Sequence, residues 1–180
     1  MVGPVGTPTL IIVSGPGGSG KTTLAHQLAA TVGCPALCRD EIKEGMVASN
    51  PGFVPTTRDP LTVRTYDLFF EAITLFLRAE VTLVAEAGFQ HSLWWHGLEP
   101  LTDSAILRII RCQVPNEVSR RRALARMTTQ PTRTAHADYE HFSEPRTFDA
   151  IRLDAPTLDV DTSDGWNPHL EEIATFCRRR

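Results

Sequence analysis

Apolar runs alternate with amphipathic segments along the 180 residues of this chain. Each short apolar run is predicted to form a strand, and these runs lie at residues 9–14, 36–38, 81–85, 104–112 and 157–161. Helices are predicted where apolar residues recur at helical spacing, at residues 21–32, 41–47, 61–79, 116–127 and from Asn167-Pro168 onward. Strands that alternate with helices indicate a doubly wound α/β fold with a parallel sheet.

The polar segments between these elements are expected to be loops. Residues 50–60 carry several turn signals, and residues 90–99 follow the third predicted strand. A polar stretch over residues 128–136 is rich in threonine and contains a proline, so it is expected to be mobile. The apolar and aromatic stripe of the long helix over residues 61–79 is interpreted as core rather than as a ligand site. Specificity for a ligand is expected to lie in the loops over 50–60 and 90–99.

Composition limits the class of protein. A chain of 180 residues is long enough for a single domain, residues 1–180, and too short for two full ones. The net charge of −3 and the pI near 6.1 provide no overall basic field for nucleic acid. The sequence shows neither a signal-peptide pattern nor an apolar run long enough to span a bilayer. Four cysteines without C-x-x-C spacing are interpreted as reduced thiols, so we expect a cytoplasmic protein.

The segment Gly15–Thr22 fits the pattern G-x-x-x-x-G-K-[ST] and lies between the first predicted strand and the first predicted helix. Backbone N–H groups and the helix dipole favour phosphate at that position, and glycines let the chain approach it closely. Lys21 is predicted to contact the β- and γ-phosphates, and the Thr22 hydroxyl is predicted to bind Mg²⁺. The residues assigned to nucleotide binding are Gly15, Gly17, Gly18, Ser19, Gly20, Lys21, Thr22 and Thr23. The alternative for Thr23 is that it is an ordinary helical residue. A glycine-rich turn that matches the motif by chance is disfavoured, because a predicted strand and a predicted helix flank the segment.

Asp40 is the candidate general base. In open α/β sheets ligands bind beyond the carboxyl ends of the strands, and Asp40 directly follows the second predicted strand. A carboxylate there can contact the substrate and accept a proton from an attacking hydroxyl. The alternative is that Asp40 is the N-cap of the next helix. The two roles are compatible.

Glu86 closes the third predicted strand and has two candidate roles. An acidic residue at that point can bind Mg²⁺, and it can equally bind the substrate; a structural hydrogen bond is the third interpretation. Gln90, His91 and Trp95 follow it and are assigned to the substrate, because aromatic and hydrogen-bonding groups suit a polar organic acceptor. For Trp95, and for its neighbour Trp94, packing in the core is the alternative.

An arginine-rich helix precedes the polar stretch, and the two together are interpreted as a lid over about residues 120–145. Arg122 and Arg126 are i,i+4 neighbours, so one helix face can present both guanidinium groups. A lid arginine can stabilise the charge that develops during phosphoryl transfer, so both are candidate catalytic residues, and Arg126 is also assigned to the nucleotide. Arg133 is a further candidate. Arg120 and Arg121 are interpreted as a solvated face.

The chain resembles the small P-loop kinases, in particular the group that contains chloramphenicol phosphotransferase, the zeta toxins and the kinase domain of polynucleotide kinase. The resemblance extends over nearly the whole chain and is carried by Gly15–Thr22, Asp40-Glu41-Ile42, Glu86-Ala87-Gly88-Phe89, Val118–Arg126 and Asp161-Thr162-Ser163. It implies a three-layer P-loop NTPase fold with a five-stranded parallel sheet flanked by helices and a short lid. It also implies Mg²⁺-ATP as donor and a hydroxyl of a small molecule as acceptor. The segment Arg39-Asp40-Glu41 lacks the Asp-x-Asp pattern of shikimate kinases, which disfavours shikimate as the substrate. The short lid lacks a nucleoside-monophosphate-binding insertion, which disfavours a nucleotide kinase.

The favoured hypothesis is therefore an ATP-dependent kinase for a hydroxyl of an antibiotic, a nucleoside-like compound or a sugar derivative. One alternative is a 5′-hydroxyl nucleic-acid kinase, which the acidic charge balance disfavours. Another is an ATP-binding switch or ATPase without an acceptor of its own. GTP is disfavoured because the guanine signature Asn-Lys-x-Asp does not occur in the sequence. Neither the identity of the acceptor nor the oligomeric state follows from these patterns.

Overall fold

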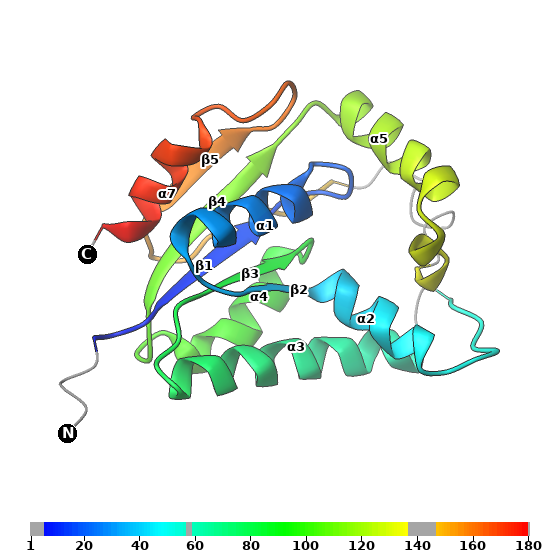
Figure 1. Ribbon diagram of the computed structural model, residues 1–180, viewed down its shortest axis with the longest axis horizontal. Coiled ribbons are helices and arrows are strands. Elements are labelled where there is room, and N and C mark those ends of the chain that lie inside the picture. The colour runs from blue at the N-terminus through cyan, green and yellow to red at the C-terminus, as the bar shows by residue number, and fades with distance from the viewer. Residues whose placement is uncertain (1–5, 57–58, 137–146, 180) are drawn as a thin grey trace.

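The computed structural model describes residues 6–56, 59–136 and 147–179. Its centre is a five-stranded, wholly parallel sheet with the strand order β2-β3-β1-β4-β5 (Figure 1). The strands are β1 (Thr9–Ser14), β2 (Ala36–Cys38), β3 (Leu83–Ala87), β4 (Ile106–Gln113) and β5 (Thr157–Asp161). The helices are α1 (Lys21–Val32), α2 (Arg39–Ala48), α3 (Pro60–Arg78), α4 (His91–Leu98), α5 (Asn116–Thr129) and α7 (Leu170–Arg178). Two short 3₁₀ helices, η1 (Glu99–Leu101) and η2 (Pro131–Ala135), complete the described structure.

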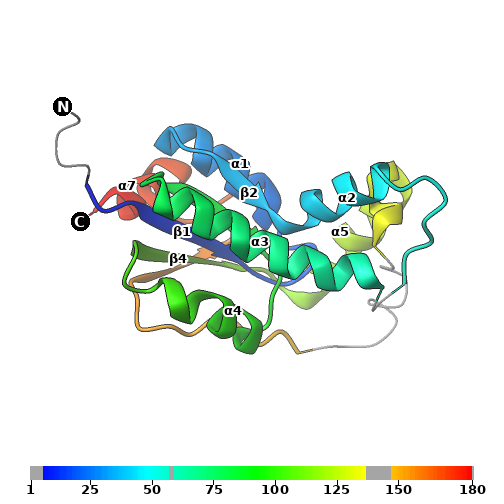
Figure 2. The same cartoon turned by 90° about the horizontal axis from the view of Figure 1, so that it is seen from below.

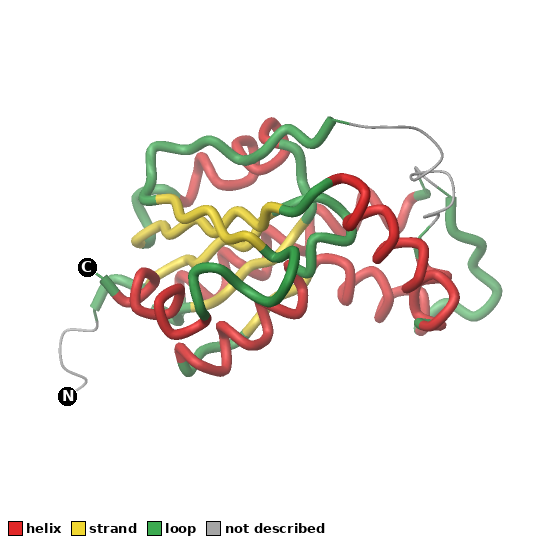
Figure 3. The backbone as a smooth tube through the Cα atoms, turned by 90° about the horizontal axis from the view of Figure 1, so that it is seen from above, coloured by secondary structure: helices red, strands yellow, loops and turns green. Residues whose placement is uncertain are grey.

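Helices cover both faces of the sheet, which makes three layers (Figures 2 and 3). The side chains of Leu10 and Ile12 in β1 point into a core shared with α3 and α4. Those of Ile11 and Val13 point into a second core shared with α1 and α7. All four residues are fully buried, as expected for a central parallel strand covered on both sides. None of the described helices combines the length and the apolar character needed to cross a membrane.

The carboxyl ends of the strands share one edge of the sheet because all strands run in the same direction. The loop after β1, the start of α2 after β2 and the last residues of β3 therefore meet there. α5 and η2 extend beyond this edge and return towards α2 (Figure 1). The fold thus brings the three segments expected to carry chemistry to one place, with the α5–η2 arm facing them.

Most predicted elements agree with the structure, but three expectations are corrected. β3 ends at Ala87, so Glu86 lies within the strand rather than at its end. Residues 91–98, expected to be a loop, form α4, and residues 128–136, also expected to be a loop, contain the end of α5 and η2. The part of the predicted lid after residue 136 lies outside the described residues.

Packing explains why α4 was missed. Gly97 lies inside this short helix and weakens its helical signal, because glycine is a poor helix former. A Cβ at Gly97 would lie only 2.2 Å from the ring of Phe70, so the close approach of α3 excludes a side chain there. The tertiary contact therefore overrides the local preference at this position.

Candidate active site

The loop between β1 and α1 leaves the N-terminus of α1 open to a ligand. α1 begins at Lys21, and its N-cap Gly20 has a φ of 77° and makes no side-chain cap. α3, in contrast, is capped by Asp59, whose side chain accepts a hydrogen bond from the Thr62 N–H. Because the first N–H groups of a helix lack intrahelical partners, the start of α1 is suited to bind an anion.

Gly18 joins this loop to α5 through a close backbone approach. Gly18 has a φ of 82°, and a Cβ there would lie 2.1 Å from the carbonyl oxygen of Ser119. The Ser119 hydroxyl donates a hydrogen bond to the carbonyl of Gly17. The start of α5 therefore rests on the glycine loop. Ser19, next to the N-cap of α1, is fully buried, and its hydroxyl has no partner among the described residues.

Lys21, Thr22 and Glu86 form a cluster next to the loop, in which Lys21 and Glu86 are buried and Thr22 is half-buried. The Thr22 hydroxyl donates to Glu86 Oε2 at 3.0 Å, and Lys21 Nζ lies 3.6 Å from Glu86 Oε1. Burial raises the pKa of Glu86, although the nearby charge of Lys21 opposes this rise. The two residues predicted to bind Mg²⁺ are thus in direct contact. A hydroxyl and a carboxylate oxygen are hard ligands of the kind that Mg²⁺ takes in proteins, so this pair fits the ion that the fold implies.

Asp40 lies in the first turn of α2 and is surrounded by cations. Arg39 Nη1 donates to Asp40 Oδ1 at 3.1 Å, and Arg133 Nη1 from η2 donates to Asp40 Oδ2 at 2.9 Å. Burial alone would raise the pKa of Asp40, but the charges of His136, Lys21, Arg39 and Arg133 outweigh it and hold the pKa well below its usual range. Asp40 is therefore a carboxylate at neutral pH.

The alternative role of Asp40 as a helix cap is excluded. α2 begins at Arg39, and its N-cap is Cys38, which makes no side-chain cap.

Asp40 instead connects α2 to the arm, together with Glu44 one turn later. Glu44 Oε1 lies 3.2 Å from His136 Nε2 and 3.8 Å from Arg133 Nη1. Two acidic residues of α2 thus face two basic residues at the end of the arm.

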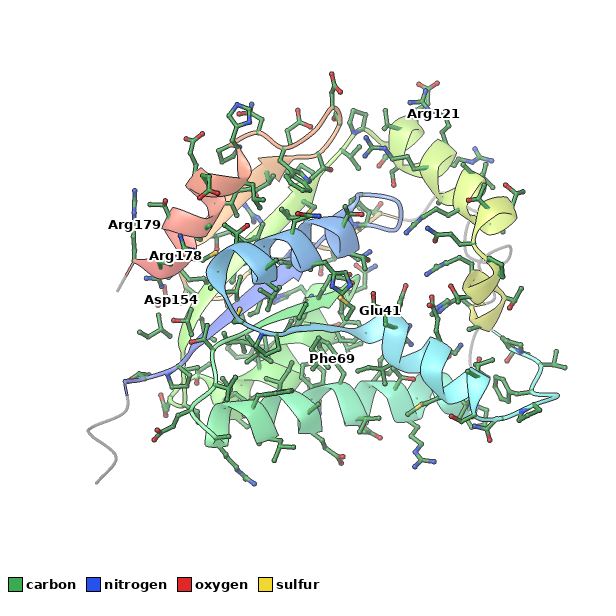
Figure 4. The ribbon with its side chains drawn as sticks, in the orientation of Figure 1. Glu41, Phe69, Arg121, Asp154, Arg178 and Arg179 are labelled. Carbon is green, nitrogen blue, oxygen red and sulfur yellow. The ribbon has the colours of Figure 1, made fainter. Side chains whose placement is uncertain are left out.

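The arginines of α5 point to different places. Arg122 donates from Nη1 to the carbonyl of Thr162 at 2.8 Å and from Nη2 to the carbonyl of Ser163 at 2.7 Å. It therefore connects α5 to the loop after β5, at the opposite edge of the sheet from β2. Arg121 is exposed and points away from the molecule (Figure 4). Arg126 is half-buried in the last turn of α5.

The residues after β3 that were assigned to the substrate mostly contact the segment before β5. Gln90 Oε1 accepts a hydrogen bond from the Asp149 N–H at 2.6 Å, and His91 Nδ1 accepts one from the Arg152 N–H at 3.3 Å. Trp95 is 47% exposed on α4. Trp94 belongs to the core, where its Nε1 donates to the Ser14 hydroxyl at 3.1 Å, so its interpretation as a packing residue is confirmed.

His26 connects α1 to the start of α2 and was not singled out from the sequence. Its Nε2 lies 2.7 Å from Glu41 Oε1 and 3.6 Å from Cys38 Sγ. Figure 4 shows Glu41 at the start of α2, on the side towards α1. Burial, with the nearby acidic groups, raises the pKa of the Cys38 thiol well above its usual range. The only sequence signal for this contact is that His26 lies four residues after Thr22, one helical turn along α1.

The parallel sheet, the glycine loop and the facing arm define a P-loop NTPase fold of the kinase type. The family model described as an AAA domain matches residues 10–145, and the chain belongs to this family. A comparison with functionally curated proteins gives no match.

Solved structures of similar fold include several kinases. A candidate kinase from Chloroflexus aurantiacus aligns with a TM-score of 0.81 and 26% identity, over 96% of this chain and 98% of that one. A gluconokinase from Sinorhizobium meliloti aligns with a TM-score of 0.54 and 17% identity, over 95% and 89%. The APS kinase CysC from Mycobacterium tuberculosis, solved with AMPPNP and APS, aligns with a TM-score of 0.66 and 14% identity, over 98% and 100%. The two more distant similarities establish the fold alone.

Proposed function

We propose that this protein is an ATP-dependent kinase that transfers the γ-phosphate to a hydroxyl of a small organic molecule. The observation that supports it most is the position of the Asp40 carboxylate. Asp40 is close enough to Lys21 of the glycine loop for the lysine charge to lower its pKa, and it also contacts Arg133 of the arm. An ionised carboxylate between the donor loop and a lid is suited to accept the proton of an attacking hydroxyl.

Each remaining residue has a role in this proposal. Lys21 binds the β- and γ-phosphates, while the backbone of the glycine loop and the N-terminus of α1 bind the phosphate oxygens. Thr22 and Glu86 hold Mg²⁺, which when bound neutralises charge on the phosphate oxygens. The direct contact of these two residues supports the metal role of Glu86 over a substrate role.

For the lid we assign Arg126 and Arg133 to the charge that develops on the transferred phosphate. Arg122 is committed to the carbonyls of Thr162 and Ser163, and we assign it to positioning α5. Gln90, His91 and Trp95 stay predictions for acceptor binding; of these, Gln90 and Trp95 are exposed and His91 is half-buried. The preferred acceptors remain an antibiotic, a nucleoside-like compound or a sugar derivative.

The proposal is tested by γ-phosphate transfer to a panel of hydroxyl compounds, with ADP release measured in parallel. ADP release that depends on an added acceptor is the expected result. ADP release at the same rate without any acceptor would instead indicate an ATPase. Oligonucleotides with a free 5′-hydroxyl belong in the panel, because transfer to them that falls steeply with salt would indicate a nucleic-acid kinase.

Asp40→Asn tests the base itself. Loss of the proton acceptor should lower kcat by about 10²- to 10⁴-fold, while the affinity for AMPPNP stays within a few-fold of the wild-type value. Asp154→Asn is the matched control, because Asp154 is exposed and lies far from α2 and the arm (Figure 4). Full activity of Asp40→Asn would exclude Asp40 as the base.

A further inference from the structure

Arg39 carries buried hydrogen-bond donors that no described residue uses. Its side chain is only 11% exposed, and its guanidinium lies over the ring of Tyr66, with Cζ 4.8 Å from the ring centroid. Nη1 is bound to Asp40, but Nε and Nη2 are buried and have no hydrogen-bond partner among residues 6–56, 59–136 and 147–179. Within those ranges, the Ser19 hydroxyl in the glycine loop is the only other buried side-chain polar group in this condition.

An unpaired buried donor is costly, and the cost is larger for a charged group. Proteins rarely retain such a group unless something outside the chain satisfies it. Both residues with unpaired buried polar atoms belong to the candidate active site, one on the donor loop and one beside Asp40. This placement indicates that the missing partner of Arg39 is a ligand.

The two unpaired nitrogens identify the kind of ligand. Nε and Nη2 share one edge of the planar guanidinium, and their N–H bonds can bind the two oxygens of a single carboxylate or phosphate in parallel. Arg111 uses the same edge elsewhere in the chain: its Nε and Nη2 lie 2.6 and 2.8 Å from the two carboxylate oxygens of Asp159. Arg39 therefore presents, unpaired, the edge that pairs with an oxyanion in Arg111.

The position of Arg39 indicates that this oxyanion belongs to the acceptor and not to ATP. Arg39 follows β2, the edge strand, whereas the glycine loop follows β1, and β3 lies between the two strands. Tyr66, which contacts the guanidinium, belongs to α3, and α3 packs against the opposite face of the sheet from α1, the helix that follows the glycine loop. A group on the open edge of Arg39 would lie next to Asp40, the residue that receives the acceptor hydroxyl in the proposed mechanism.

We propose that the acceptor is an anionic hydroxyl compound whose carboxylate or phosphate is bound by Nε and Nη2 of Arg39. This inference rests on the proposed kinase function and adds the chemical class of the acceptor. In the reaction, the acceptor oxygen forms the new bond to the γ-phosphorus and its proton passes to Asp40. The bond between the γ-phosphorus and the bridging oxygen breaks, and ADP leaves with that electron pair. The anionic group itself is unchanged, so Arg39 is a specificity residue.

The kinetic test uses acceptors in matched pairs that differ only in the anionic group, such as gluconate with sorbitol and glycerol 3-phosphate with glycerol. The pairs also distinguish a carboxylate from a phosphate as the bound group. We expect the charged member of at least one pair to be preferred about 100-fold or more in kcat/KM, since a site with unpaired buried donors discriminates strongly against a ligand that leaves them unpaired. Arg39→Lys keeps the charge and removes the two-nitrogen edge. It should raise KM for the charged acceptor at least 10-fold and leave kcat within about 5-fold.

Arg121→Lys is the matched control, because Arg121 is exposed and points away from the site, so its kinetics should equal those of the wild type. Preference for neutral acceptors, or an equal effect of Arg39→Lys on charged and neutral acceptors, would overturn the inference and leave the kinase function intact.

Two further measurements do not depend on catalysis. With AMPPNP and Mg²⁺ saturating the donor loop, calorimetric titration with malonate and with inorganic phosphate should show binding that Arg39→Lys weakens at least 10-fold. If this binding is seen but no acceptor is phosphorylated, the anion site stands and the kinase function fails; if neither probe binds the wild type, the anion site fails. Arg39→Met removes two buried donors that have no partner among the described residues, and Asp40 keeps its ion pair with Arg133, so the unfolding temperature of the variant should equal or exceed that of the wild type. A lower unfolding temperature with unchanged anion binding would make Arg39 a structural residue only.

Discussion

Arg133 Nη1 lies 2.9 Å from Asp40 Oδ2, which joins the 3₁₀ helix at the end of the arm to the first turn of α2. The contact closes the arm over the edge of the sheet where the glycine loop lies (Figure 1). It also places a guanidinium beside the residue proposed to take the acceptor proton. The arm is therefore held against α2 by the carboxylate that is proposed to act as the base.

Replacing Arg133 should affect the chemical step more than nucleotide binding. Arg133→Ala removes a positive charge from the place where charge develops during transfer, so kcat should fall about 100-fold or more. The dissociation constant of AMPPNP should change by only a few-fold. Arg121→Ala serves as control, because it removes an exposed arginine of the same arm. An equal loss of nucleotide affinity and kcat would instead assign Arg133 to ground-state binding.

The pH dependence of the reaction should reflect the low pKa of Asp40. Because neighbouring cations hold that pKa well below its usual range, Asp40 is ionised throughout the range of ordinary assays. Protonation of Asp40 should therefore cause no loss of kcat/KM between about pH 5 and 8. Removing one of the cations, as in Arg133→Ala, raises the pKa of Asp40, so the acid limb of the profile should move to higher pH. An acid limb at the same pH in the wild type and in Arg133→Ala would contradict the ion pair between Arg133 and Asp40.

The sequence predicted the parts of the fold that depend on local patterns. β1, α1 and β2 were predicted with the bounds that the structure has, because their apolar runs are flanked by strong glycine and charge signals. The glycine loop and the contact partners Thr22 and Glu86 were recognised from motif spacing and strand position. α4 was missed because Gly97 is explained only by the ring of Phe70 in another helix.

The contacts of the arm could not be predicted because they connect residues far apart in the chain. Arg133 and Asp40 are separated by 93 positions, and Arg122 and Thr162 by 40, so no local period relates them. The i,i+4 spacing of Arg122 and Arg126 suggested a shared role, yet the guanidinium of Arg122 is held by backbone carbonyls after β5. The unpaired edge of Arg39 is likewise a property of packing, since burial by neighbouring elements makes those two donors costly.

Gly18 should be the least replaceable glycine of the loop for the stability of the unliganded protein. An alanine at Gly18 would have to adopt a positive φ, and its Cβ would lie 2.1 Å from the Ser119 carbonyl oxygen. α5 would therefore have to move. Gly20 has a similar φ of 77°, but a Cβ there has nothing within 4 Å. Gly20→Ala should cost about 1 kcal/mol of unfolding free energy from backbone strain alone. Gly18→Ala should cost clearly more, as measured by urea denaturation, and equal costs would argue against the contact with Ser119.

The ion pair of Lys43 and Asp59 should stabilise the fold and have no catalytic role. Lys43 Nζ lies 2.8 Å from Asp59 Oδ2, and both side chains are only 3% exposed. Lys43→Met leaves the Asp59 carboxylate buried without its cation, so the free energy of unfolding should fall by about 3–5 kcal/mol. Arg111→Gln breaks the exposed pair with Asp159 and should cost at most about 1 kcal/mol. Similar losses of unfolding free energy in the two variants would show that burial does not control how much an ion pair contributes to stability.

The same ion pair makes the stability depend on pH in a defined direction. Burial acts to raise the pKa of Asp59, but the hydrogen bond and charge of Lys43 and the Thr62 N–H outweigh it, so the pKa is lowered in the folded state. A carboxyl group with a lowered folded pKa binds more protons when the chain is unfolded. Its contribution is therefore complete above the ordinary carboxyl pKa of about 4 and is lost as the pH falls through the folded value. Urea denaturation at pH 7 and pH 3 should show a smaller acid-induced loss for Lys43→Met than for the wild type, because the variant lacks the cation that lowers this pKa. An equal loss in both proteins would mean that other carboxylates account for the acid sensitivity.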